Sequence, residues 1–570
     1  MDRIQDPPLV AGRRGLTGRL AAPAWLEPLA IALALLLVTS APTVYGYLAA
    51  PAEKWFSGVV FNVHDTAQYL SWMREFGARL LIENKLTSEP NPAIYFNLHW
   101  FIPGRLAAWL GASVLDAYQA FRVVSVPVAA LVAWWFCGLF TPDPGRRRFA
   151  FWLATLTSGL GWIWVVYKQV TGELSFPHDV YTTPGNTFWL MLASPHLTFA
   201  LAMVLGVLGL AWLSVQRGRF RLALAAAGLA LCLGLGHIYD LVLVWSVLGA
   251  FGGLLTLRDG WRWRTFFSLV VVVAVSAPAA LYFAWVSSSA NPTWQEALAQ
   301  YDNLGAFTPA PLHLLIFLGL TLFLAAAGLV AQWRLPARPA GQGAWRGWLR
   351  AHPDRDLWLG GWVIVNLVII YLPLKFAVML LLALQFPLAL LAADFVFDRL
   401  RPWLRARAGG LTLARVAPAL LLAAVLPTNL YLFAWRLLDL RRADYPYYLY
   451  RSDAAAMACL AAHAFPDEVV LSGFETGHFL PGLTGLRAFL SNAVMTLDFN
   501  ARREQVAAFF AAGTPDADRQ ALLAENGVDY VYVSPLERAL GDFDPAWCST
   551  RPRPASTAWP RPRPPGIARG

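Results

Sequence analysis

The sequence predicts a polytopic α-helical membrane protein with about eleven spans and a small α/β domain near its C-terminal end. Of its 570 residues, 57% are hydrophobic and 14% are charged, and the mean hydropathy is +0.48. Soluble domains average roughly 45–50% apolar and about 25% charged residues, so a soluble protein is excluded. Apolar runs long enough to cross a bilayer, about 20 residues each, recur between positions 25 and 438. We therefore expect residues 25–438 to form a helical transmembrane domain.

Ten apolar runs supply the expected spans. The run at 222–257 is too long for one crossing and is interrupted by the glycines and histidine at 234–237, so we expect a hairpin of two helices there. This hairpin brings the number of spans to eleven. The other nine runs lie at 25–50, 122–140, 149–167, 189–213, 265–286, 311–332, 357–373, 376–397 and 415–438.

The arginines predict the orientation of the spans. They cluster in alternate loops, whereas the loops between these clusters contain few basic residues. This positive-inside pattern places the N-terminal tail, 1–24, in the cytoplasm and, after eleven spans, the C-terminal domain outside. The net charge of +10 has the same origin, so no nucleic-acid partner is expected. A bacterial cytoplasmic membrane is the expected location, with the lipid bilayer as the constant partner.

The composition of the sequence changes after the last apolar run. Residues 439–548 contain short β-branched segments and amphipathic segments, which are typical of a small α/β domain. The loop at 473–481 follows the first expected strand at its carboxyl end, where α/β sheets bind ligands, and is a candidate for gating an acceptor. Residues 549–570 are rich in proline and arginine and predict a disordered tail. The expected elements are strands at 469–472 and 528–533 and helices at 497–512 and 514–526.

The first external loop, 51–121, carries the clearest candidate for a catalytic group. Asp65 follows the first span closely and begins an amphipathic stretch, in which Tyr69 and Trp72 share one helical face with it. Further along, the segment 94–112 is nearly long enough to span but contains charged and polar groups that are costly at the bilayer centre. We therefore expect an interfacial helix at 94–112.

This arrangement resembles the GT-C superfamily of membrane glycosyltransferases, which includes the protein O-mannosyltransferases and the lipid A aminoarabinose transferase. The shared features are an inside N-terminus, an acidic residue soon after the first span, interfacial helices, many spans and an outer C-terminal domain. The resemblance implies an inverting enzyme that moves a sugar from a polyprenyl-phosphate carrier to an acceptor hydroxyl on the outer face. The acidic pair usual in the family is replaced here by His64 and Asp65, so a divalent cation is an open candidate cofactor.

The same resemblance implies roles for particular residues. Asp65 would be the catalytic base, and Asp179, in the second external loop, matches the second acidic position of the family. The alternatives are that Asp65 caps a helix and that Asp179 is an ordinary turn residue. Candidate substrate-binding residues are those that could stabilise a leaving phosphate or line a polar cavity at the outer boundary: His64, Tyr69, Arg74, Lys85, His99, Arg105, His196, His237, Asp240 and Lys375.

Two other functions remain open from the sequence. The first is a transporter or flippase for a lipid-linked substrate, although such proteins often contain matching halves with broken helices, and only one broken hairpin occurs here. The second is a non-catalytic GT-C-like membrane protein, because the usual acidic pair is missing. Each basic residue taken alone also has a simpler interpretation as an interfacial anchor that extends its charge toward the lipid headgroups.

Overall fold

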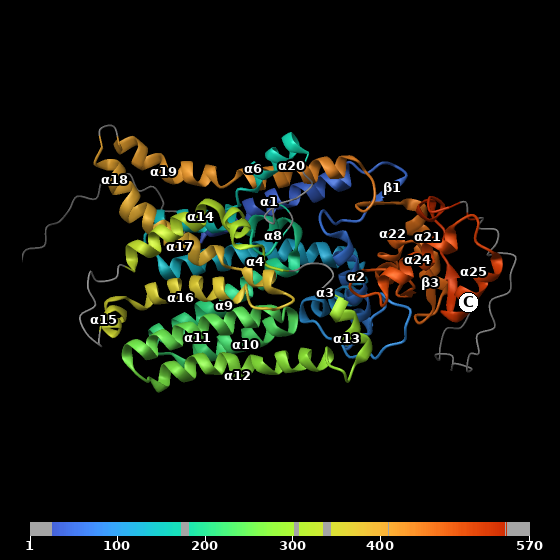
Figure 1. Cartoon of the computed structure of the whole chain (residues 1–570), viewed down its shortest axis with the longest axis horizontal. Helices are drawn as coiled ribbons and strands as arrows, with labels where there is room; N and C mark the ends of the chain where they lie inside the picture. The colour runs from blue at the N-terminus through green and yellow to red at the C-terminus, as the bar shows by residue number, and fades with distance from the viewer. Residues whose placement is uncertain are drawn as a thin grey trace, which may run out of the picture.

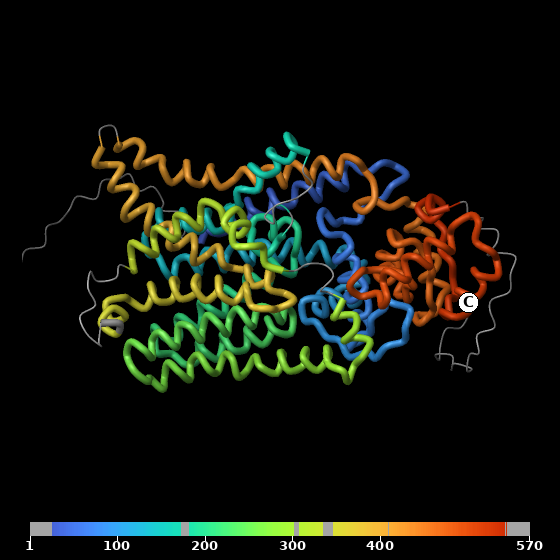
Figure 2. The backbone as a smooth tube through the Cα atoms, viewed as in Figure 1, coloured from blue at the N-terminus to red at the C-terminus, as the bar shows by residue number. Residues whose placement is uncertain are grey.

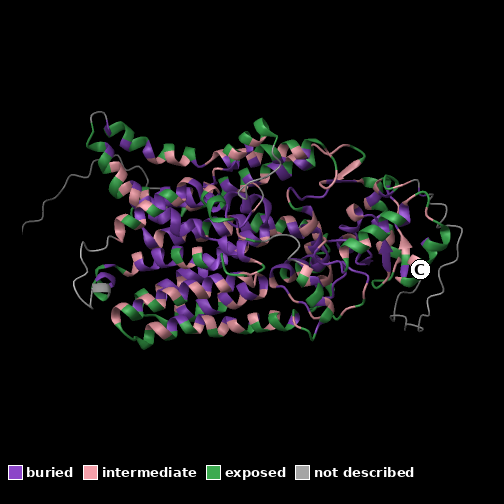
Figure 3. Cartoon of the chain, viewed as in Figure 1, coloured by how far each residue is buried: buried purple, intermediate pink, exposed green. Residues whose placement is uncertain are grey.

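The computed structural model describes residues 25–172, 180, 182–300, 307–333, 344–407, 410–541 and 543. The tails expected at 1–24 and 549–570 and the candidate Asp179 therefore lie outside the described residues. A long bundle of helices makes up most of the molecule, and a smaller part with short strands lies at one end (Figure 1). Buried residues concentrate in the middle of the bundle, and exposed residues follow its outer faces (Figure 3).

The described residues contain eight helical segments that are long and apolar enough to cross a membrane. A bent pair, α19 (Gly410–Ala424) and α20 (Pro427–Arg441), would add a ninth; the two helices meet at 41°. The multi-span helical architecture expected from the sequence is thus confirmed. The eight segments are α1 (Leu26–Leu48), α4 (Val114–Phe140), α5 (Pro144–Leu156) with α6 (Gly161–Thr171), α9 (Pro195–Arg217), α11 (Tyr239–Asp259), α12 (Trp263–Val286), α14 (Pro311–Gln332), and the run Ala377–Arg405 that contains α17 (Gln385–Phe395) and α18 (Arg401–Arg405).

Two further predicted spans are shorter helices. These are α10 (Phe220–Gly236), with 17 residues, and α16 (Asp354–Ile369), with 16 residues. A 16-residue helix rises about 24 Å, which is less than the hydrocarbon core of about 30 Å. The total of eleven spans therefore stays a prediction. The expected hairpin is present, because α10 and α11 run side by side on either side of a break at His237 (Figures 1 and 2).

The arginine-rich loops meet at one end of the bundle. Arg146, at the start of α5, contacts Asp394 at 3.1 Å and also pairs with Asp398. Arg258, at the end of α11, pairs with Asp354 at the start of α16. In Figure 1 the helices α15 (Ala344–Ala351) and α18 lie at this end, and the part with short strands lies at the opposite end. This segregation agrees with the arginine pattern of the sequence, whose assignment to inside and outside stays a prediction.

The part at the opposite end contains a three-stranded parallel sheet. Strand β3 (Val469–Leu471) lies between β4 (Arg487–Ala488) and β5 (Val528–Val531). The helices α24 (Phe499–Phe510) and α25 (Asp516–Glu525) cover much of its apolar surface, together with Phe489 and Phe543. The strands β3 and β5 and the helices α24 and α25 lie within the segments expected from the sequence, whereas β4 was not expected. The remaining helices here are α21 (Arg451–His463), α22 (Phe474–Gly477), α23 (Leu480–Thr484) and α26 (Pro535–Arg538).

The loop at 51–121 packs between the bundle and this sheet. Its strand β1 (Lys54–Phe56) pairs antiparallel with β2 (Tyr448–Tyr450), which leads into the C-terminal part. The segment expected to be interfacial forms α3 (Leu98–Leu110), whose 13 residues rise only about 20 Å, too little to cross the hydrocarbon core. The other helices on this side are α2 (Val63–Ala78), α8 (Thr187–Ala193) and α13 (Pro292–Ala299).

Candidate functional site

Asp65 lies in the first turn of α2, where the helix meets the C-terminal part. The helix begins after Asn62, which has a left-handed backbone (φ 48°) that asparagine tolerates better than most residues. The Asn62 amide donates to the Asp65 carboxylate, and the Asn492 amide, which donates to the carbonyl oxygen of His64 at 3.2 Å, lies near enough to favour the charged form of Asp65. Burial raises the pKa of Asp65, and the two amides oppose this shift by favouring the charged form.

The contacts of Asp65 bear on the two hypotheses for this residue. A capping carboxylate accepts a backbone N–H of the first turn. The side chain that donates to Asp65 is instead the amide of Asn62, the residue that precedes α2. Asp65 is thus a carboxylate held by a neutral group at the start of the helix, and its catalytic role stays a prediction.

A pair of histidines joins α2 to the C-terminal part next to Asp65. His64 Nδ1 lies 2.9 Å from His478 Nε2, and His478 Nδ1 lies 2.6 Å from the carbonyl oxygen of Phe474. That carbonyl can only accept, so His478 Nδ1 carries the hydrogen and His478 Nε2 accepts from His64 Nδ1–H. His64 Nε2 is then left with a lone pair. Burial lowers the pKa of both rings, that of His478 to about 3.

Sequence reasoning did not single out His478 and Asn492. Both follow the parallel sheet in loops, and the only signal was the position of the loop at 473–481 after the first strand. The structure places this loop directly on α2, where Gly482 packs so closely that an added Cβ would lie 2.9 Å from Cβ of Leu70. The C-terminal part therefore contributes side chains to the site.

One helical turn beyond Asp65, Tyr69 leads into a second group of polar residues. Its ring stacks on Trp100 with centroids 4.4 Å apart and lies 4.7 Å from the ring of His196. The ring of His196 is 6.2 Å from that of His237, and His237 Nδ1 lies 2.9 Å from Asp240 Oδ2. These contacts bring together four candidates from three distant parts of the sequence, because His237 and Asp240 are three residues apart.

His99 completes this group, and we call His99, His196, His237 and Asp240 the histidine cluster. His99 is 2% exposed and packs against Gly236 at the break between α10 and α11. Both ring nitrogens of His99, Nδ1 of His196 and Oδ1 of Asp240 are buried without a hydrogen-bond partner among the described residues. Buried polar atoms are rarely left unpaired in proteins, so the cluster is suited to a ligand with several hydroxyl or phosphate oxygens.

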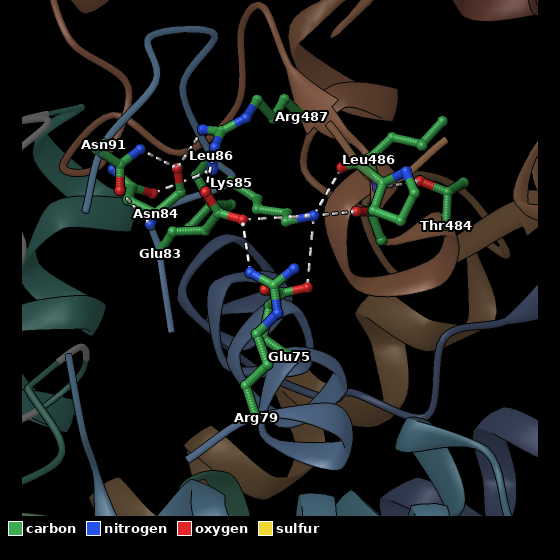
Figure 4. Close-up of polar contacts among 12 residues, drawn as sticks. Glu75, Arg79, Glu83, Asn84, Lys85, Leu86, Asn91, Thr484, Leu486 and Arg487 are labelled. Atoms are coloured by element: carbon green, nitrogen blue, oxygen red, sulfur yellow. Dashed lines mark hydrogen bonds and ion pairs between the residues drawn. The ribbon is translucent and has the colours of Figure 1, made fainter. Parts of the chain in front are cut away.

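Lys85 is placed differently from our expectation. Its ammonium nitrogen donates to the carbonyl oxygens of Pro466 at 2.6 Å and Gly485 at 2.8 Å and lies 3.5 Å from Glu75 (Figure 4). The side chain is 1% exposed, and these three acceptors take up its three hydrogens. The assignment of Lys85 to a substrate phosphate is therefore corrected: this lysine joins the external loop to the C-terminal part.

Arg105 also has a structural contact. Its guanidinium donates to the carbonyl oxygen of Gly77 at 3.2 Å, near the end of α2, and lies over the ring of Phe101. The carbonyl groups at the C-terminal end of a helix lack partners within the helix and carry a partial negative charge, which attracts a cation. Arg105 thus binds the C-terminal end of α2. No contact among the described residues joins it to the histidine cluster.

Two predicted cations remain near the site. The Arg74 guanidinium lies against Gly485, on the side of α2 that faces the C-terminal part. Lys375 is exposed in the turn that follows α16, and its neighbour Phe376 lies 4.5 Å from the ring of Tyr239. The ring of Tyr239 is 5.5 Å from that of His237, so Lys375 lies near the edge of the histidine cluster.

No metal centre is formed by the described residues alone: among them, no group of three or more His, Cys, Asp or Glu side chains could hold a metal ion. Asp179, the second acidic candidate, lies outside these residues. Asn62 presents its NH₂ group, which cannot ligate a cation, to Asp65.

No family model and no curated protein matches the chain. Among solved structures it is similar to the oligosaccharyltransferase of Archaeoglobus fulgidus tethered with an acceptor peptide, with 14% identity over 88% of this chain and 68% of that one and a TM-score of 0.48. It is also similar to ArnT from Cupriavidus metallidurans bound to undecaprenyl phosphate, with 16% identity, coverage of 93% and 95%, and a TM-score of 0.47. These identities are too low to transfer residue roles.

Proposed function

We propose that the chain is an inverting glycosyltransferase that moves a sugar from a polyprenyl-phosphate carrier to an acceptor hydroxyl at the outer face of the membrane. The observation that carries this proposal is the environment of Asp65. A partly buried carboxylate accepts a hydrogen bond from the Asn62 amide at the junction of the bundle and the C-terminal part. One helical turn further on, Tyr69 contacts a cluster of imidazole and carboxylate groups, several of whose atoms have no hydrogen-bond partner among the described residues. A polar, enclosed arrangement of this kind is suited to proton transfer next to a bound sugar phosphate.

Asp65 would act as the base. As the acceptor oxygen attacks the anomeric carbon, its proton passes to the carboxylate, and the bond from that carbon to the phosphate oxygen breaks with its electron pair on the phosphate. Burial raises the pKa of Asp65 and so makes the ionised carboxylate a better proton acceptor, while the Asn62 and Asn492 amides keep it ionised.

The histidine cluster would bind the donor. The unpaired nitrogens of His99 and His196 and the free oxygen of Asp240 can accept or donate hydrogen bonds to sugar hydroxyls and phosphate oxygens. Arg74 and Lys375, which lie near the site, would stabilise the leaving phosphate. Lys85 has no part in this proposed step, because its three hydrogens are taken up inside the fold. Arg105 is also left out, because its guanidinium lies at the end of α2 on the Gly77 carbonyl and the Phe101 ring.

The substitution Asp65→Asn tests the proposal. With purified full-length protein and a labelled polyprenyl-phosphate sugar in detergent, we expect loss of label from the lipid to slow by about 10²–10⁴-fold. The matched control is Asp116→Asn, because Asp116 occupies the same helical position in α4 but forms a capping box with Ser113. Retained turnover in Asp65→Asn, or binding of the lipid by the unaltered protein without any turnover, would overturn the proposal. The second result would favour a non-catalytic GT-C-like protein.

Thermal stability separates this role from a structural one. Folding raises the pKa of Asp65 above its ordinary value of 3.8. At a pH above 3.8, the Asp65 carboxyl is therefore protonated more often in the folded state than in the unfolded state. Its ionisation at pH 7 therefore destabilises the fold. Asp65→Asn should not lower the melting temperature at pH 7, and any gain should shrink as the pH falls toward about 4. A clear loss at pH 7 would instead indicate a capping role.

A further inference from the structure

Two grooves flank the first turns of α12. These turns lie at the arginine-rich end of the bundle, away from α2 (Figure 1). The first, the α11–α12 groove, has a volume of about 450 Å³. The second, about 420 Å³, lies between α12 and the turn from α9 to α10. Neither groove includes a residue of the proposed site, so they raise a separate question about what occupies them in a membrane.

The α11–α12 groove has a floor of backbone and apolar walls. Gly249 and Gly253 of α11 line it, and a Cβ added at either would meet no atom within 4 Å. Trp245, Phe266 and Val273 contribute to its walls. Along α12 the lining runs from position 262 to 273, a rise of about 16 Å. This matches the depth of one leaflet, about half of the 30 Å hydrocarbon core.

The mouth of the groove is aromatic and basic. Trp261 and Trp263 are 52% and 61% exposed, as is typical of tryptophans at a membrane interface. Arg262 lines the first groove and Arg264 the second, and both side chains are exposed. The nearby carboxylate of Asp259 lies 3.4 Å from Arg262 but is held more closely, at 2.8 Å, by Arg258. The charge at the mouth is therefore positive overall.

We propose that the α11–α12 groove binds an anionic phospholipid, with one acyl chain along Gly249 and Gly253 and the headgroup at Arg262 and Arg264. Basic side chains at the membrane surface attract anionic lipids. A helix from another protein fits less well. A helix with its side chains is about 10 Å across, so a piece about 16 Å long would occupy more than twice the volume of the groove.

The test uses the purified full-length protein in detergent. Its melting temperature and the lipid that it retains in native mass spectrometry are measured with phosphatidylglycerol and with phosphatidylcholine. We expect phosphatidylglycerol to raise the melting temperature by several degrees and to be retained, and phosphatidylcholine to do neither. Gly253→Leu places a side chain in the groove from a position where an added Cβ meets no atom within 4 Å, and it should abolish the shift. Arg262→Gln with Arg264→Gln should weaken binding by about tenfold or more.

Matched controls make the result specific. Gly228→Leu adds the same side chain at another open glycine that lines neither groove, and Arg415→Gln removes an exposed arginine of α19. Both controls should keep the full shift. Equal effects of the two lipids, or a full phosphatidylglycerol shift in Gly253→Leu, would overturn the proposal. A change in oligomeric mass in Gly253→Leu without loss of lipid would also overturn it and would favour a protein partner.

Discussion

The buried position of Lys85 leads to a prediction that separates a structural role from a substrate-binding role. In Lys85→Met the apolar stem of the side chain is largely kept, but the ammonium group is lost. The carbonyl oxygens of Pro466 and Gly485 and the carboxylate of Glu75 then lose a shared donor (Figure 4). All three belong to the junction between the external loop and the C-terminal part, so the damage should be local to this junction.

The expected cost follows from the burial of these groups. Removing one partner of a buried ion pair costs about 3–5 kcal/mol, because the remaining groups stay desolvated without a partner. The matched control is Lys54→Met. Lys54 also bridges the two regions, through Ala443 and Asp444, but the Asp444 side chain is 72% exposed. An exposed pair contributes about 0–1 kcal/mol, so the control should weaken the junction far less.

Hydrogen exchange of the backbone amides at 480–488 measures this difference. One of these amides, that of Ala488, donates to the carbonyl oxygen of Lys85 itself. A loss of 3 kcal/mol corresponds to local opening that is more than about a hundredfold more frequent. Lys85→Met should show this acceleration and Lys54→Met should not. Unchanged exchange in Lys85→Met together with a loss of sugar transfer would refute the structural role and restore the phosphate-binding hypothesis.

Two further predictions concern the same junction. Burial lowers the pKa of His478 to about 3, so below pH 6.5 the unfolded state binds more protons than the folded state and stability is lost as the pH falls. The variant His478→Gln should therefore flatten the dependence of the melting temperature on pH between 6.5 and 4.5. Identical slopes in the variant and the unaltered protein would contradict this. Gly482→Val places a Cβ atom 2.9 Å from Cβ of Leu70 and should destabilise the docking of α23 on α2 by about 1–3 kcal/mol, measured as faster proteolysis between the two regions. The control Gly513→Val changes an open glycine of the C-terminal part and should have little effect. Equal proteolysis of the two variants would argue against the contact.

The positions of the helices could be predicted from the sequence because they depend on local properties. An apolar run satisfies its own backbone hydrogen bonds as a helix and needs no distant partner to define its ends. The break at His237 and the short helix α3 followed from glycine, proline and charge within the same segments. The shared face of Asp65, Tyr69 and Trp72 needed only the helical period.

The roles of single polar groups could not be predicted in this way. Lys85 finds its acceptors 381 and 400 residues further along the chain, and His64 meets His478 across 414 residues. A lysine after an external helix has the same local sequence whether its ammonium group faces a lipid phosphate or two buried carbonyls. Only the packing of the C-terminal part on α2 decides between them, because that packing removes water from one side chain and leaves another accessible.

From the sequence alone came a membrane protein of many helices and a carboxylate at the start of one of them. The tertiary structure then decided which cations are used up in holding the fold together and which polar atoms stay buried without a partner near that carboxylate. The physical reason is that burial and hydrogen bonding depend on atoms that approach in space, and most of those atoms lie hundreds of residues apart in the chain.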